Sequence, residues 1–320
     1  MAGTAAYLTI CFIGIPCITA YNVLASIFRG MGDSRSPMYF IAAACVVNIG
    51  LDFFFMGALR LGPAGAALGT TLSQAVSVLL ALCVILKRRS IRLSKSDFCP
   101  RKATMKDILS IGLPVAAQDG FIQVSFMLIT IMANQRGLTD AAAVGIVEKI
   151  ISFLFLVPSS MLSTVSALGA QNIGAGKYDR VDDILRYAIA IGVGFGAVMA
   201  LLMQFIAPSM VRPFTSDEAV VLAGAAYIRS YIFDCLFAGI QFSFSGYFCA
   251  WGRSGLSFLH NTLSILLVRV PGAWLACRFF PQTLVPMGLA PACGSLFSSI
   301  VCILLYRWMK RQNKPTGDKD

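Results

Sequence analysis

The chain alternates long apolar runs with short polar or basic segments. Nine runs are long enough to cross the hydrocarbon core of a bilayer, which needs roughly 20 helical residues. They fall at about residues 4–28, 37–57, 64–86, 108–133, 142–166, 184–210, 220–249, 257–280 and 286–306. The runs are continuous rather than alternating, and backbone groups in lipid must be satisfied within their own segment. The pattern therefore predicts an all-α, polytopic membrane protein with nine transmembrane helices.

The composition agrees with this prediction. Of the 320 residues, 57% are hydrophobic and only 13% are charged, and the mean hydropathy is +0.76. The net charge of +11 comes from basic residues between the apolar runs, so it indicates topology and not nucleic-acid binding. The ten cysteines lack C-x-x-C spacing and His260 is the single histidine, which leaves zinc sites and Ser/His catalysis incomplete. We expect neither an enzyme nor a resident cofactor.

Positive charge predicts how the chain crosses the membrane. The loop after the third run and the tail after the ninth are strongly basic, and basic loops face the cytoplasm. In a cell membrane we therefore expect a cytoplasmic C-terminus and, with nine spans, Met1 outside. A chain that starts outside, almost within a helix and without a basic signal region, is expected to lack an odd number of upstream helices.

An internal repeat relates two segments of three runs each. Residues 7–88 can be laid on residues 227–311, and the sequence FRGMGDS at 28–34 then meets FCAWGRS at 248–254. The fourth to sixth runs precede the second copy and have no counterpart before the first. This predicts two six-helix halves, of which the first has lost its opening three helices. Secondary transporters use such repeats to build a binding site near the membrane midplane.

The repeat also predicts the domain boundaries. We expect a partial N-lobe at residues 1–90, a basic cytoplasmic linker at 91–106, a C-lobe at 107–310 and a cytoplasmic tail at 311–320.

An acidic residue lies inside the second apolar run. Asp52 follows Asn48 by one helical turn, so the two side chains share a helix face. A charged side chain in hydrocarbon costs roughly 2.5 kcal/mol or more, and it marks an ion or proton pathway by default. The alternative is a structural hydrogen bond to Asn48 or to a neighbouring helix. The spacing favours two side chains that converge on one small cation or share one proton.

Other polar residues in the apolar runs are candidates for a substrate cavity. Asp119 and Gln123 form a second pair one turn apart, which suits attraction of a cation or simple packing polarity. Glu148 has a lysine directly after it, so an ion pair with that neighbour is its alternative role. Arg269 must face a cavity or a carboxylate if it lies within a span. We predict that these four side chains line the cavity.

Four motifs together resemble the multidrug and toxic compound extrusion (MATE) family of the flippase-like MOP superfamily. They are FRGMGD at 28–33, N-x-x-x-D at 48–52, GAALGT at 65–70 and AQNIGAGK at 170–177. The resemblance covers essentially the whole chain. It implies a fold of two lobes, each of six helices, facing a central cavity. The chain then looks like helices four to twelve of that fold, with a truncated first lobe.

The resemblance also implies a coupling-ion site. In the branch whose site lies in the N-lobe, the ligands are Tyr and Asn on the fourth helix, Asn and Asp on the fifth, and Thr on the sixth. By motif and spacing these look like Tyr7, Asn22, Asn48, Asp52 and Thr70. That site also takes an Asp from the first helix, which this chain does not contain. In the other branch the coupling residue is an acid on helix ten, where this chain has Ala238.

Three of these residues have alternative roles. Asn22 and Thr70 could join helices by hydrogen bonds, and Tyr7 could belong to an interfacial aromatic belt.

The residues and the resemblance together predict an antiporter coupled to H⁺ or Na⁺ that exports organic cations or drugs across the cytoplasmic membrane by alternating access. The ion is transported and is not a cofactor. One alternative is a lipid-linked oligosaccharide flippase, whose cavity is usually rich in Arg and Lys. The other is a truncated, non-transporting fragment that needs its missing N-terminal helices in trans. The expected partners are the lipid bilayer and a small-molecule substrate.

Overall fold

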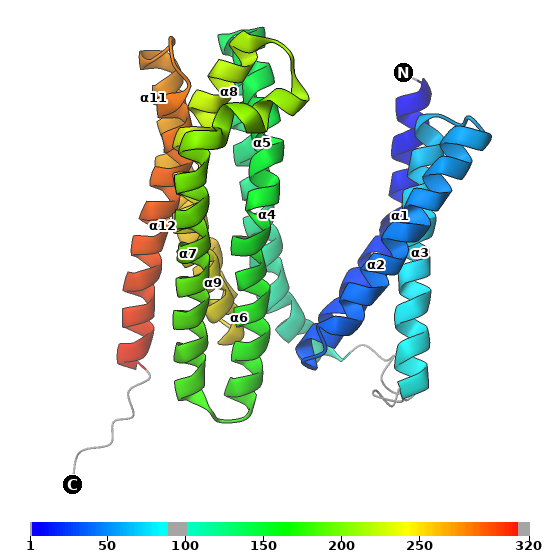
Figure 1. Ribbon diagram of the computed structural model, residues 1–320. Coiled ribbons are helices and arrows are strands. Elements are labelled where there is room, and N and C mark those ends of the chain that lie inside the picture. Colours follow the sequence, from blue (N-terminus) through cyan, green and yellow to red (C-terminus); the bar gives the residue numbers. More distant parts are fainter. Residues whose placement is uncertain (1, 89–100, 313–320) are drawn as a thin grey trace. The chain divides into compact units, whose positions relative to one another are not determined.

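The computed structural model describes residues 2–88 and 101–312. Within these ranges nine helical stretches are long and apolar enough to cross a membrane, which confirms the all-α, polytopic architecture. The chain divides into two compact units, Met1–Pro100 (unit 1) and Arg101–Asp320 (unit 2), and most of their helices are labelled in Figure 1. Most of the predicted linker and tail falls outside the described residues, and the lobe boundaries stay predictions.

Unit 1 contains three spanning helices. α1 (Ala2–Gly30) and α3 (Pro63–Arg88) pack along each other, and α2 (Arg35–Asp52) packs on α3. A π-helical segment, η1 (Phe53–Ala58), continues α2 directly after Asp52. The hydrophobic core of this unit contains the buried side chains of Tyr21, Ala25, Phe28, Phe40, Ala81 and Ile85.

Small and hydroxyl-bearing residues bring the helices of unit 1 close together. A Cβ atom added at Gly14 of α1 would lie 2.6 Å from Oγ1 of Thr71 on α3. The Ser77 hydroxyl donates to the Phe40 carbonyl at 3.2 Å and joins α3 to α2. Helices in lipid associate by such close packing and hydrogen bonding because burial of apolar surface gives them little drive.

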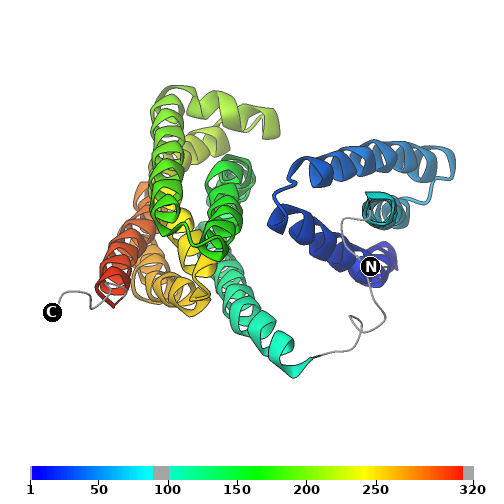
Figure 2. The same cartoon turned by 90° about the horizontal axis from the view of Figure 1, so that it is seen from below.

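Unit 2 is built around α9 (Phe233–Ala250), most of which is buried. α9 packs against α6 (Leu156–Gly174), α7 (Tyr178–Val211), α10 (Ser254–Ser264) and α12 (Val285–Gln312). Figure 2 views this bundle from below. The other elements of the unit are α4 (Lys102–Arg136), α5 (Leu138–Leu154), η3 (Arg212–Phe214), α8 (Glu218–Tyr231), η4 (Ile265–Arg269) and α11 (Val270–Phe279).

Four of the predicted runs contain more than one helical segment, and the second is divided between α2 and η1. The fifth breaks at Phe155, between α5 and α6, because Pro158 has no N–H to donate to the carbonyl four residues earlier. The seventh breaks at Ile232, between α8 and α9. The eighth includes the π-helical segment η4, which ends at Arg269. Apolar length predicts a span but not its hydrogen-bond pattern, so these breaks were not predicted.

Three helices end in the same tight turn. The backbone N–H groups of Asp33, Lys177 and Arg253 donate to the carbonyls of Phe28, Asn172 and Phe248 at 2.9, 2.8 and 2.8 Å. The preceding glycines Gly32, Gly176 and Gly252 have φ angles of 84°, 70° and 67°. This left-handed position favours glycine and closes a helix C-terminus. The first and third turns correspond in the internal repeat, so the repeated sequence forms the same local structure twice.

Arg136 fixes the end of α4 to the connection between α11 and α12. Its Nε lies 2.7 Å from the Asp140 carboxylate, and its two terminal nitrogens donate to the carbonyls of Phe280, Pro281 and Thr283 at 2.9 to 3.1 Å. The side chain is only 6% exposed. One buried guanidinium therefore joins two helix ends to a segment about 145 residues later in the chain.

Candidate functional site

Asn48 and Asp52 meet α3 at Gly69. A Cβ atom added at Gly69 would collide with Oδ1 of Asp52, and it would lie 3.3 Å from the Asp52 Cγ and 3.5 Å from the Asn48 Nδ2. Both side chains of α2 therefore use the space that the missing side chain of Gly69 leaves. The shared helix face predicted from their spacing is present, and α3 closes one side of it.

Both side chains keep unfilled hydrogen-bonding capacity. The Asn48 Nδ2 and the Asp52 Oδ1 are buried and have no hydrogen-bond partner among the described residues. Buried polar atoms in folded proteins almost always have a partner, either protein or water. The Asp52 Oδ1 can therefore accept a small cation, a proton or a hydrogen bond from an ordered water, and the Asn48 Nδ2 beside it can donate to such a water.

The backbone beside the pair departs from α-helical geometry. η1 begins at Phe53, immediately after Asp52, and single-turn π segments are frequent at functional sites. Gly65, one turn before Gly69 on α3, gives η1 its space, since a Cβ atom there would lie 3.1 Å from the Phe55 backbone. The two glycines of the GAALGT motif thus let α3 approach the end of α2 closely.

The other three predicted ligands contact residues of their own helices. The Asn22 Nδ2 donates to the Ile18 carbonyl at 2.9 Å, and the Thr70 Oγ1 donates to the Ala66 carbonyl at 3.0 Å. Both partners lie one turn back on the same helix. Tyr7 is exposed and lies beside Cys11, also on α1. The structure brings Asn48 and Asp52 together, and convergence of all five residues on one ion stays a prediction.

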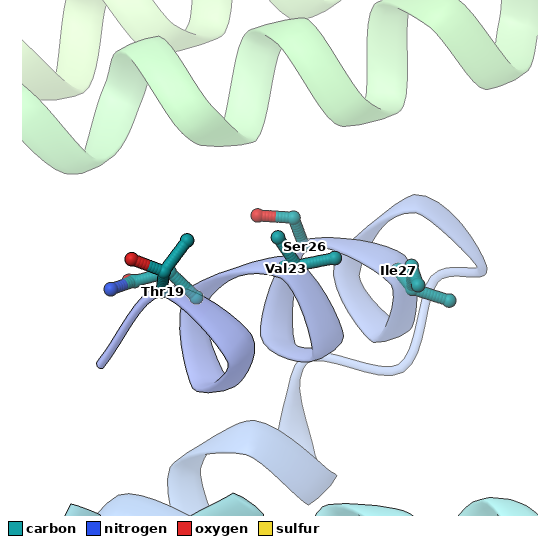
Figure 3. A pocket seen from close by; sticks show the side chains of 5 residues that line it. Thr19, Val23, Ser26 and Ile27 are labelled. Atoms are coloured by element: carbon teal, nitrogen blue, oxygen red, sulfur yellow. The ribbon is translucent and has the colours of Figure 1, made fainter. Parts of the chain in front are cut away.

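Asn22 nevertheless belongs to a hollowed face of α1. This hollow is lined by the side chains of Thr19, Asn22, Val23, Ser26 and Ile27. Figure 3 shows these side chains along one side of α1. Their spacing of three and four residues is that of a single helix face. The face mixes hydroxyl, amide and apolar groups, a composition that suits an amphiphilic ligand.

The four predicted cavity residues of unit 2 have different surroundings. Asp119 and Gln123 are exposed on α4. Glu148 is half-buried and accepts hydrogen bonds from the Thr130 hydroxyl at 3.3 Å. Arg269 is buried, and one of its terminal nitrogens donates to the Tyr231 hydroxyl at 2.9 Å. A common cavity lined by all four stays a prediction.

Two buried residues of unit 2 were given no site role in the sequence analysis. Gln118 accepts a hydrogen bond from the Ser257 hydroxyl at 2.7 Å and joins α4 to α10. Asp234 is fully buried on α9. Asp119 was predicted to line the cavity because it is charged, although the preceding residue, Gln118, makes the contact between helices. A polar residue inside an apolar run was the available signal in both cases.

Spanning helices that pack through glycine and contain polar and charged side chains are typical of helical membrane proteins with a transport function. This chain belongs to the MatE family, whose model matches residues 1–54 and 114–275. The family consists of transporters and not of enzymes.

Individual relatives agree with this assignment. The chain is 30% identical over 305 residues to the probable multidrug resistance protein YpnP of Bacillus subtilis, covering 94% of this chain and 67% of that protein. It is 22% identical over 312 residues to the probable multidrug resistance protein NorM of Thermotoga maritima, with coverages of 95% and 67%. A solved MOP superfamily transporter from Pyrococcus furiosus has the same fold, with a TM-score of 0.89, 22% identity and coverages of 95% and 69%.

Proposed function

We propose that this chain takes part in the export of organic cations or drugs across the cell membrane in exchange for H⁺ or Na⁺. The observation that carries the proposal is the pair of unpartnered, buried atoms on Asn48 and Asp52 over Gly69. Proteins similar to this chain are named as multidrug resistance proteins, which supports drug-like substrates.

Asp52 has the role of the exchanging group. A carboxylate within a membrane span is costly unless a proton or a cation neutralises it. When the site faces outside, Asp52 takes up the ion. When the site faces the cytoplasm, the ion leaves and the carboxylate is charged again. Coupling requires that the occupied and empty forms favour different conformations of the transporter, since a ligand shifts an equilibrium only through its differential affinity.

Asn48 supplies the second oxygen-bearing group, one turn away. Oxygen ligands from carboxylate and carboxamide side chains suit hard cations such as Na⁺, and the amide also orients a protonated carboxyl by hydrogen bonding. The cation-exchange role extends to Tyr7, Asn22 and Thr70 if they turn toward Asp52 in another conformation. In that case ion binding breaks the hydrogen bonds that Asn22 and Thr70 now make within their own helices.

The test is drug efflux by the 320-residue chain in proteoliposomes, driven by an inward gradient of Na⁺ or H⁺. Asp52→Asn should abolish gradient-driven efflux while membrane insertion stays intact. The matched control is Asp183→Asn, which removes an exposed carboxylate of α7 with a weak Arg186 neighbour at 3.8 Å. Efflux by Asp52→Asn equal to that of the unchanged chain refutes the coupling role.

A binding measurement separates the antiporter from the fragment alternative. Thermal stability of the detergent-solubilised chain is measured with and without Na⁺ and over a pH series, for the unchanged chain and for Asp52→Asn. An ion response that requires Asp52, without efflux, favours a chain that binds its ion but needs further helices in trans. No response and no efflux contradict the antiporter and its ion site at Asp52, and favour a fragment that neither binds the ion nor transports by itself.

A further inference from the structure

One face of α12 changes from apolar to aromatic to basic toward the end of the helix. Ile300, Leu304, Trp308 and Arg311 follow one another at intervals of four, four and three residues, so they lie along one side of the helix. The first three are 50%, 59% and 47% exposed, and Arg311 is exposed as well. The helix rises about 16 Å from Ile300 to Arg311, close to half of a hydrocarbon core of roughly 30 Å. The order of side chains on this face therefore matches the depth of one leaflet, from acyl chains to headgroups.

A second arginine, from the turn between α9 and α10, lies over the same tryptophan. The guanidinium carbon of Arg253 is 5.9 Å from the centre of the Trp308 ring, within cation–π distance. The backbone of Arg253 is held by the turn, since its N–H donates to the Phe248 carbonyl at 2.8 Å. The next residue, Ser254, donates its hydroxyl to the Ser110 carbonyl of α4 at 3.1 Å. The turn therefore presents Arg253 at a fixed place beside Trp308.

The end of α12 is itself held by contacts with Asp182 of α7. One oxygen of this carboxylate accepts hydrogen bonds from the hydroxyls of Tyr247 on α9 and Tyr306 on α12, at 3.3 and 3.2 Å. The other oxygen pairs with Lys310 of α12. Three helices are thus joined within one turn of Trp308. Because the indole is placed before any ligand binds, a ligand at this position costs little ordering of the protein.

The two arginines beside Trp308 have no acidic partner, unlike other basic groups of unit 2. Arg136, Arg212 and Lys310 each pair with a carboxylate. Among the described residues, neither the Arg253 nor the Arg311 side chain makes an ion pair or a hydrogen bond, and Arg253 is half-buried. The planar guanidinium matches the geometry of a phosphate group, and basic pockets between spanning helices bind phospholipid headgroups. This combination suits an anion that comes from outside the chain.

We propose that Arg253 and Arg311 bind the phosphate of an anionic phospholipid at the end of α12. The two guanidinium groups contact the phosphate, and the Trp308 indole lies at the level of the glycerol backbone, where tryptophan is enriched in membrane proteins. An acyl chain of the same lipid runs along Leu304 and Ile300. The predicted topology places this site in the cytoplasmic leaflet. The inference concerns lipid binding by unit 2 and does not depend on drug transport or on the coupling ion.

The test measures quenching of Trp308 fluorescence by lipids with brominated acyl chains. The chain has 3 tryptophans, so every variant also contains Trp251→Phe and Trp274→Phe, which leaves Trp308 as the reporter. Phosphatidylglycerol and phosphatidylcholine with the same brominated chains are compared in vesicles of otherwise equal composition. The binding constant of phosphatidylglycerol relative to phosphatidylcholine should be about fivefold or more, since each basic side chain near the surface favours anionic lipid by about that factor. Equal quenching by the two lipids overturns the proposal.

Two double variants separate this site from a general attraction between anionic lipid and positive charge. Arg253→Gln with Arg311→Gln should reduce the relative binding constant to about one, because both phosphate ligands are lost. Arg186→Gln with Arg278→Gln removes the same net charge from two other exposed positions of unit 2 and should keep the preference for phosphatidylglycerol. A preference that survives the loss of Arg253 and Arg311, or that falls equally in the control, overturns the proposal.

Inorganic phosphate shows whether the site takes a lipid or a free anion. When it replaces chloride at equal ionic strength, the preference for phosphatidylglycerol should stay, because free phosphate makes no contact with the apolar part of the α12 face. Loss of the preference in phosphate assigns the site to a free anion and overturns the lipid proposal.

A single substitution keeps the test valid if the Arg253→Gln, Arg311→Gln chain does not fold, as judged by size-exclusion chromatography. Arg311 is exposed near the end of α12, so Arg311→Gln should leave the fold intact. Its relative binding constant for phosphatidylglycerol should fall by about half or more. An unchanged value in Arg311→Gln overturns the proposal and leaves Arg253 with a packing role against Trp308.

Discussion

Gly192 on α7 and Gly239 on α9 pack backbone against backbone. A Cβ atom added at Gly192 would lie 2.8 Å from the Gly239 Cα, and one added at Gly239 would lie 2.6 Å from the Gly192 carbonyl carbon. One turn along α7, a Cβ atom at Gly196 would lie 2.6 Å from the Leu236 Cα. At these two glycines of α7 the absence of a side chain allows the backbone of α9, the central helix of unit 2, to approach closely.

Gly239→Ala should destabilise unit 2. The new methyl group meets backbone atoms, which cannot rotate away, so the two helices must separate at a cost of about 1–3 kcal/mol. The measurement is thermal denaturation of the detergent-solubilised chain. Gly194→Ala on α7 is the control, because a Cβ atom there meets nothing within 4 Å. Equal melting temperatures for Gly239→Ala and Gly194→Ala would show that the close approach does not matter.

Arg136→Ala should be more damaging than loss of an exposed arginine. It leaves the Asp140 carboxylate, which is 21% exposed, without its partner, and three carbonyls without their donor. Removing one member of a buried ion pair costs about 3 kcal/mol or more. The comparison is Arg212→Ala, whose pairing with Glu218 at 2.9 Å is 62% exposed on both sides and contributes at most about 1 kcal/mol. Chemical or thermal unfolding of the two variants should differ accordingly, and a similar loss in both contradicts the role of Arg136.

Gly69→Ala should disturb the candidate site more than the fold. The added methyl group collides with Oδ1 of Asp52, the end of a side chain that can rotate, so the carboxylate moves away from Asn48. We expect the ion affinity measured through Asp52-dependent thermal shifts to fall about tenfold or more, equivalent to roughly 1.4 kcal/mol. Gly57→Ala in η1 is the control, with nothing within 4 Å of its Cβ position. An unchanged ion response in Gly69→Ala would show that Gly69 does not contribute to the ion site.

Reporter fusions test the predicted orientation. A GFP fused to the C-terminus should fluoresce, because the basic residues that precede it favour the cytoplasmic side. Alkaline phosphatase fused after Pro281, in the connection predicted to lie outside, should be active. The reversed pattern of activity would show that the positive charges do not set the topology of this chain.

Apolar runs predicted the nine spans because lipid requires long, continuous helices. They did not predict the π-helical segments beside Asp52 and Arg269, since a widened turn has the same hydropathy as an α-helical one. For the site, the i, i+4 spacing predicted that Asn48 and Asp52 share a helix face. The role of Gly69 was not predicted, because it depends on how α3 is aligned against α2, and the spacing of residues along one helix carries no information about that alignment.

Charged residues outside known motifs were the hardest to interpret. Asp234 appeared in the sequence only as one acid in an apolar run, and its neighbour Arg269 comes 35 residues later. Their proximity arises from the packing of α9 against the helix that contains η4. Long-range contacts of this kind become visible only when the bundle is assembled.

The bend after α1 and the bend after α9 share a hydrogen-bond pattern and a left-handed glycine, yet the next residue is Asp33 in one and Arg253 in the other. Because the shape of this turn depends on a residue without a β-carbon, the turn itself does not require a particular charge on the residue that follows. Duplicated halves of such a protein are therefore free to diverge in surface charge at equivalent corners while each keeps the geometry that returns the chain into the membrane.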